Sequence, residues 1–157
     1  MSFGNLFIFL HIFTMFIAVA LSIGTELVLH RVAATENVAA IRTTFGAAQP
    51  LARAMAPVYG IGFLFGLIAA ITGSFNLLAP WLLIAYVLFV VSSILGGRVI
   101  GGWATKVGKA AATIQGEAAS AELKQLVHDA RISQAIWINA GVIALIVLTM
   151  VFKPFGV

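Results

Sequence analysis

Six polar or sulfur-bearing side chains interrupt the apolar segment near the start of the chain. Each residue of an α-helix rotates by about 100° around the helix axis, so all six side chains point within roughly 60° of the direction of His11. They are His11, Thr14, Met15, Ser22, Thr25 and Glu26. An imidazole can bind a metal or carry a proton, and a carboxyl can exchange a proton or pair with a cation. The spacing therefore predicts a single polar face on one helix, with His11 toward its outer end.

His11 has the widest range of chemistry among these residues. It could be the axial ligand of a haem iron or a proton carrier, or it could be a neutral imidazole that hydrogen bonds to a neighbouring helix. Met150, near the end of the last apolar segment, lies at a suitable height to be a second ligand, since His and Met form a known axial pair. Its alternative role is to fill a gap in an apolar interface. A haem with His11 as its single axial ligand is equally consistent with the sequence.

Glu26 and His30 form a second polar group at the other end of the same segment, one helical turn apart. They could be half of a metal site or part of a proton path. Alternatively, they could be an interfacial ion pair or a contact with lipid headgroups. The third histidine, His128, lies in a polar segment and is expected to be solvated.

The composition indicates the environment of the elements that position these side chains. Of 157 residues, 62% are hydrophobic and 9% are charged, and the mean hydropathy is +1.10. Soluble domains average roughly 45–50% apolar and 25% charged residues, so water is excluded as the main solvent. The absence of cysteine excludes disulfides, thiolate zinc sites and iron–sulfur clusters. The net charge of +4 is better explained by membrane topology than by nucleic-acid binding, which we do not expect.

Four apolar runs predict an all-α, four-transmembrane-helix bundle that forms a single integral membrane domain over residues 1–157. Each run is close to the ~20 residues that a helix needs to cross a bilayer, and only helices satisfy their own backbone groups there. Apolar residues at helical spacing after Ser120 predict that the fourth helix begins before the membrane and extends into the cytoplasm. The expected helices are about 6–29, 54–72, 77–95 and 120–152.

The distribution of basic residues predicts the orientation of the bundle. Eight of the nine Lys and Arg residues fall in two segments, 31–53 and 98–131, and only Lys153 lies on the other side. By the positive-inside rule, both segments face the cytoplasm and both termini are extracytoplasmic. We expect residues 32–53 and 104–134 to form the inner connections.

Small residues predict how the helices meet. Gly62 and Gly66 form a small-xxx-small row that permits close backbone approach. We expect this row to serve helix packing, and it is a candidate contact for a homo-oligomer or a membrane partner.

Several short motifs carry a family resemblance over nearly the whole chain. They are Leu10-His11, Thr72-Gly73, Trp81-Leu82, Ala85-Tyr86-Val87-Leu88 and Met150-Val151-Phe152-Lys153-Pro154. The chain resembles an uncharacterised bacterial family of predicted four-helix integral membrane proteins, which implies the bacterial inner membrane. More distantly, it is similar to the copper-resistance protein D family and to HemJ-type protoporphyrinogen oxidases. The HemJ-type resemblance implies haem b held by a histidine of the first helix, which is His11 here.

Two functional hypotheses follow. The first is a haem-b-binding membrane protein with a redox or porphyrin-handling role, in which His11 is the axial ligand. The alternative is a non-catalytic membrane subunit or scaffold of a larger complex, in which the polar face only packs. A transporter or proton channel ranks last, because ~22 Å of helix separates His11 from Glu26 with only Thr and Ser as polar residues between them.

Overall fold

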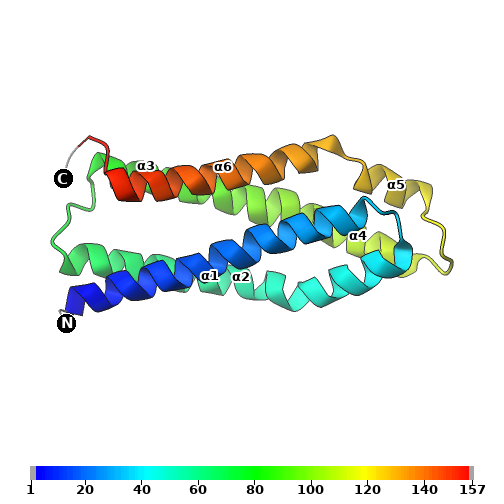
Figure 1. Ribbon diagram of the computed structural model, residues 1–157, viewed down its shortest axis with the longest axis horizontal. Coiled ribbons are helices and arrows are strands. Elements are labelled where there is room, and N and C mark those ends of the chain that lie inside the picture. The colour runs from blue at the N-terminus through cyan, green and yellow to red at the C-terminus, as the bar shows by residue number, and fades with distance from the viewer. Residues whose placement is uncertain (1–2, 156–157) are drawn as a thin grey trace.

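The computed structural model describes residues 3–155 and is helical over most of that range (Figure 1). It confirms the all-α architecture with four helical segments long and apolar enough to cross a membrane. The chain is therefore a multi-pass membrane protein. The four candidate spans are Phe3–Ala33, Val38–Thr72, Pro80–Thr113 and Ala121–Phe152.

Each of the first two spans is a single helix, whereas the third and fourth are divided. A stretch of π-helix interrupts the third span, and a short break divides the fourth. In chain order the elements are α1 (Phe3–Ala33), α2 (Val38–Thr72), α3 (Pro80–Ser93), η1 (Ile94–Ile100), α4 (Gly101–Thr113), α5 (Ala121–Val127) and α6 (Ala130–Phe152).

The spans pack as two antiparallel pairs, α1 with α2 and α3 with α6 (Figure 1). Both chain termini lie at the same end of the bundle, which we call the terminal end. The α1–α2 turn and the α4–α5 loop lie at the opposite end, which we call the basic end because Lys and Arg gather toward it. The prediction that both termini share one side of the membrane fits this arrangement, and the side itself stays a prediction.

The prediction that residues 32–53 and 104–119 connect the helices as loops is wrong for most of their length, whereas residues 120–134 lie mostly in helix, as expected. Helix α2 begins at Val38, where the Asn37 side chain caps it by accepting a hydrogen bond from the Ala40 backbone N–H, and it continues through Pro50 and Pro57. The third span continues to Thr113 instead of ending near residue 95. The physical reason is that these segments bury helical stripes, such as Val38, Ile41, Phe45 and Ala48 of α2.

The fourth helix extends toward the basic end as predicted, and its extension begins after Ser120. The Ser120 side chain caps α5 by accepting from the Leu123 N–H. A break at His128 separates α5 from α6, and Asp129 caps α6 by accepting from the Arg131 N–H. The extension is therefore a short separate helix in place of a continuous one.

Three exposed arginines indicate where the apolar band of the bundle ends. Arg53, Arg98 and Arg131 lie on three different spans, each about 30 Å along its helix from the terminal end at 1.5 Å per residue. This length matches the ~30 Å hydrocarbon core of a bilayer. The helices therefore continue past the expected membrane boundary at the basic end.

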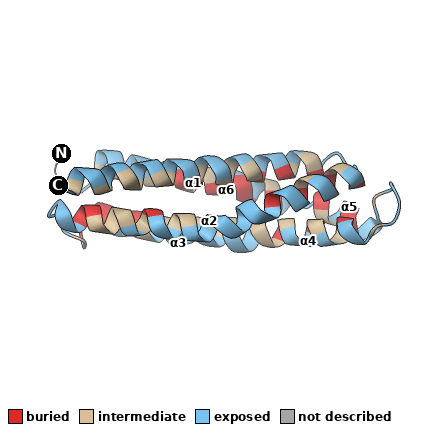
Figure 2. Cartoon of the chain, turned by 90° about the horizontal axis from the view of Figure 1, so that it is seen from below, coloured by how far each residue is buried: buried red, intermediate tan, exposed pale blue. Residues whose placement is uncertain are grey.

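The main buried core lies toward that basic end (Figure 2). Trp103 is central to it: its ring packs edge-on against Phe45, and its indole N–H donates to the Leu126 carbonyl at 2.9 Å. In contrast, only 6–28% of the most apolar window of each span is buried, as expected where side chains face lipid. The core consists of Leu29, Ala33, Val38, Ile41, Phe45, Ala48, Ile100, Trp103, Val107, Ala111, Leu123, Val127, Ile132, Ala135 and Ile136.

Polar contacts tie the connections at the basic end together. The guanidinium of Arg42 donates to the carbonyls of Ala111 and Ile114, where α4 ends. Glu36, in the α1–α2 turn, lies 2.7 Å from the His128 imidazole and 3.6 Å from the Lys124 ammonium. The hydrogen bond from His128 is the main cause that lowers the pKa of the Glu36 carboxyl. His128 is thus exposed, as expected, and also paired.

Candidate functional site

The polar face of α1 points into the bundle, as its spacing predicts. His11, Thr14, Met15, Ser22 and Thr25 are all partly buried, and Glu26 is 8% exposed. The face does not meet one common partner, however. Its outer half packs against α2, whereas Glu26 reaches α6.

His11 is held against the backbone of α2. Its Nδ1 lies 2.7 Å from the Gly62 carbonyl oxygen, which can only accept, so Nδ1 carries the proton and donates. A neutral imidazole in this tautomer keeps the lone pair on Nε2. The geometry therefore fixes the tautomer and leaves Nε2 as the nitrogen able to bind a metal.

The Gly62/Gly66 row provides the space for this contact. A Cβ atom added to Gly66 would lie 2.7 Å from His11 Nδ1, and one added to Gly62 would lie 3.1 Å from Met15 Sδ. The row thus serves close packing of α1 on α2 within the chain. Contact of this row with a further subunit stays a prediction.

Glu26 is the centre of a second polar site, at the basic-end edge of the apolar band. It accepts from the Ser22 hydroxyl at 3.1 Å, and the Asn139 Nδ2 of α6 lies 3.4 and 3.5 Å from its two carboxyl oxygens. Asn139, 1% exposed, in turn accepts from the Ser92 hydroxyl of α3 at 2.7 Å. Tyr59 of α2 interacts with both Ser22 and Glu26. We call Ser22, Glu26, Tyr59, Ser92 and Asn139 the Glu26 cluster, to which all four spans contribute.

The π-helix η1 passes directly beside this cluster. A Cβ atom on Gly96 would lie 3.5 Å from both Asn139 Nδ2 and Glu26 Oε1. π-Helical turns are rare and are found frequently at functional sites. The only π-helical winding in the described part of the chain therefore coincides with its most buried carboxyl.

The other predicted site residues lie apart from these two sites. His30 is near Trp103, with 6.3 Å between the ring centroids, and the hydrogen bonds of Glu26 go to Ser22 and Asn139. Met150 packs against the small cluster of Ala79, Trp81 and Leu82, where α3 begins. The observed contacts therefore bring neither His30 to Glu26 nor Met150 to His11. Within residues 3–155, no group of three or more His, Cys, Asp and Glu residues could hold a metal ion.

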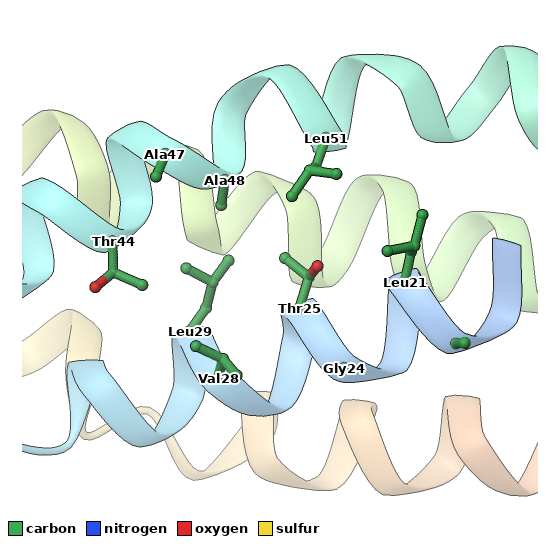
Figure 3. A pocket seen from close by; sticks show the side chains of 10 residues that line it. Leu21, Gly24, Thr25, Val28, Leu29, Thr44, Ala47, Ala48 and Leu51 are labelled. Carbon is green, nitrogen blue, oxygen red and sulfur yellow. The ribbon is translucent and has the colours of Figure 1, made fainter. Parts of the chain in front are cut away.

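A groove of about 320 Å³ lies between α1 and α2, along the half of α1 that is nearer the basic end (Figure 3). The groove is open because small residues line it, among them Gly24 of α1 and Ala47 of α2. It lies beside the turn of α2 that contains Pro50. Thr25 and Thr44 are its only polar side chains. The groove is therefore apolar and is separate from the contacts of His11 and of the Glu26 cluster.

Sequence reasoning missed Tyr59, Ser92 and Asn139 as members of a site. A signal for Asn139 was present, because an amide in the middle of an apolar run must find a partner. Its depth along the fourth run, about 20 Å from the outer end of α6, matches the depth of Ser92 along the third. The partner could not be identified from depth alone.

Comparison with known proteins adds no relative from which a function could be inferred. No family model matches the chain, and neither the curated proteins nor the solved structures include a match to it.

Proposed function

We propose that this chain is a haem-b-binding membrane protein with a redox or porphyrin-handling role, in which Nε2 of His11 is the axial ligand. The observation that carries the proposal is the hydrogen bond from His11 Nδ1 to the Gly62 carbonyl. Ligating histidines almost always donate their other ring N–H to a carbonyl or carboxylate, which fixes the ring and raises the basicity of the ligand. The position of His11 within a four-helix bundle suits such a site.

The donor set fits a single axial ligand. Met150 packs at the start of α3 with Trp81 and Leu82, so His11 would hold the haem without help from Met150. Haem supplies one-electron chemistry when bound. The chain contributes the orientation of the imidazole, which the Gly62 carbonyl sets, and the closeness of α1 to α2, which Gly66 permits.

The distribution of charge supports a location in the bacterial inner membrane with the basic end in the cytoplasm. Eight of the nine basic residues lie in segments 31–53 and 98–131, toward the basic end of the bundle. The resemblance to bacterial four-helix membrane proteins and to HemJ-type oxidases agrees with both the location and the cofactor.

The haem proposal predicts a visible spectrum. The protein purified in mild detergent should show a Soret band, and His11→Ala should lose it while keeping its helical circular dichroism and its elution volume. Met150→Leu is the matched control and should keep the band. A folded wild-type protein that remains colourless after incubation with hemin would contradict the proposal.

The orientation can be tested by cysteine labelling, because the chain has no cysteine of its own. Ser74→Cys places a thiol on an exposed position between α2 and α3, and Glu117→Cys places one on an exposed position between α4 and α5. A membrane-impermeant maleimide added to intact cells should label only the first variant, and cell lysis should make the second reactive. Labelling of Glu117→Cys alone in intact cells would invert the proposed topology.

A further inference from the structure

Glu26 is a buried carboxyl that lacks a positively charged partner among the described residues. The groups that contact it are the hydroxyl of Ser22 and the amide of Asn139, and both are neutral. Its backbone lies about 35 Å along α1 from the terminal end, and its carboxyl reaches back to Asn139, about 20 Å along α6, so it lies at the basic-end edge of the apolar band with 8% of its surface exposed. An ionised carboxylate in such surroundings is costly unless a cation or a proton neutralises it.

The other titratable and charged groups nearby leave this charge uncompensated. Tyr59 of α2 is close enough to interact electrostatically with Glu26, and its phenol is neutral when protonated. From α1 itself, His30 lies one turn further and is next to Trp103. Arg98, which follows Gly96 in η1, and Arg131 of α6 are exposed at the edge of the band. Glu26 therefore depends on a bound proton or a bound cation for neutrality.

The arrangement of the cluster suits a proton. Asn139 holds Glu26 only loosely, at 3.4 and 3.5 Å, while its other end is 2.7 Å from the Ser92 hydroxyl. The oxygen and nitrogen of an amide are nearly equal in shape. If the Asn139 amide turns over, its oxygen can accept from a protonated Glu26, and its nitrogen can donate to Ser92. Both protonation states then keep every buried polar group paired, which avoids the cost of an unsatisfied group.

We propose that Glu26 is a proton-binding site within the membrane, and that the Asn139 amide turns over as the proton binds and leaves. Ser22 donates to the carboxyl in both states, and Ser92 accepts from the amide in one state and donates to it in the other. Because Gly96 has no side chain, η1 leaves space beside the Asn139 amide, which turns, and beside the Glu26 carboxyl. This inference does not rest on haem binding.

A carboxyl that carries a proton in apolar surroundings can be detected directly. Infrared spectra of the purified protein in lipid should show the C=O stretch of a protonated carboxylic acid at neutral pH, and the band should shift in D₂O. Glu26→Gln should remove this band. Glu117→Gln, at an exposed position, is the matched control and should keep it. Absence of the band from the wild-type protein would overturn the proposal.

Reaction with dicyclohexylcarbodiimide provides a second readout, because this apolar reagent modifies protonated carboxyls. Intact mass should show one adduct per chain, which is absent in Glu26→Gln and retained in Glu117→Gln. Above the midpoint of the titration, the rate should fall about tenfold per pH unit, in step with the protonated fraction. Protection by Na⁺ at constant ionic strength would show that the site binds a metal cation instead, and would also overturn the proposal.

The role of Asn139 is tested by Asn139→Leu, which removes both the amide donor and the amide acceptor. Because the turned amide pairs with the protonated carboxyl and the unturned amide pairs with the ionised one, loss of both contacts should leave the midpoint of the infrared titration within about one pH unit of the wild type. Asn139→Asp is unsuitable because it adds a second acid. Ser93→Ala, in which the lost hydroxyl only donates to the Phe89 carbonyl of its own helix, should leave the titration unchanged. A rise of clearly more than about one pH unit in Asn139→Leu would show that the amide stabilises the ionised form alone, and would contradict the proposed turning.

Discussion

Replacing Trp103 with Ala should lower the free energy of unfolding by about 3–5 kcal/mol, the usual cost of removing a large buried aromatic side chain. Trp103 is 5% exposed and packs on Phe45. The substitution also leaves the Leu126 carbonyl without its indole donor. Because this residue joins α4 to α2 and to the end of α5, we expect the part of the bundle beyond the membrane boundary to loosen first. Denaturant unfolding in mild detergent, followed by circular dichroism, measures the change.

Two matched variants separate the causes of this loss. Trp137→Ala removes the same side chain from a position that is 68% exposed, and it should change the free energy by no more than about 0.5 kcal/mol. Trp103→Phe keeps most of the packing and removes the hydrogen bond, so it should cost about 1 kcal/mol or slightly more. Equal losses for the Ala variants at positions 103 and 137 would show that the core toward the basic end does not dominate stability.

Replacing Gly66 with Ala should displace His11. The new Cβ atom would lie 2.7 Å from His11 Nδ1 and 2.8 Å from Cε1, so either the ring or the helix must move. Overpacking of this kind costs about 1–3 kcal/mol. It exceeds the roughly 0.5–1 kcal/mol that Ala gains over Gly in a helix interior. If His11 binds haem as proposed, the same variant should also weaken the Soret band.

Gly60→Ala is the control, because no atom lies within 4 Å of a Cβ built at that position. Ala lowers the backbone entropy of the unfolded chain relative to Gly, so this variant should be as stable as the wild type or slightly more stable. Thermal unfolding of the two variants in the same detergent tests the difference. If both variants are stabilised, the close contact between His11 and α2 does not exist in the membrane.

Much of the fold could be predicted from the sequence because the bilayer imposes strong constraints. Apolar runs near 20 residues identify four spans, and the spacing of His11, Ser22 and Glu26 places one polar face inside the bundle. The parts of the second and third spans beyond the membrane boundary were missed because their composition is mixed, whereas the extension of the fourth span was predicted. Arg42 and Pro50 in an Ala-rich segment are typical of a loop, and the helix is explained by the burial of Ile41 and Phe45 in the core that contains Trp103.

The candidate sites required contacts between distant parts of the chain. Glu26 and Asn139 are 113 residues apart, and helical spacing gives the face of each residue but not its partner. His11 was identified as a key residue, yet its acceptor is the Gly62 backbone carbonyl, which the residue type does not reveal. The π-helical winding has no sequence signature in Ile94–Ile100 that we could use.

The winding of η1 also sets the rotational phase between the two halves of the third span. A π-turn holds more residues than an α-turn, and each residue of an α-helix turns the face by about 100°. This offset lets Ser92 face α6 within the membrane while Trp103 faces the core toward the basic end. Deleting one residue of η1 would turn one of these faces away by more than a quarter turn. For this segment, the number of residues is therefore a stricter constraint than the identity of most of them.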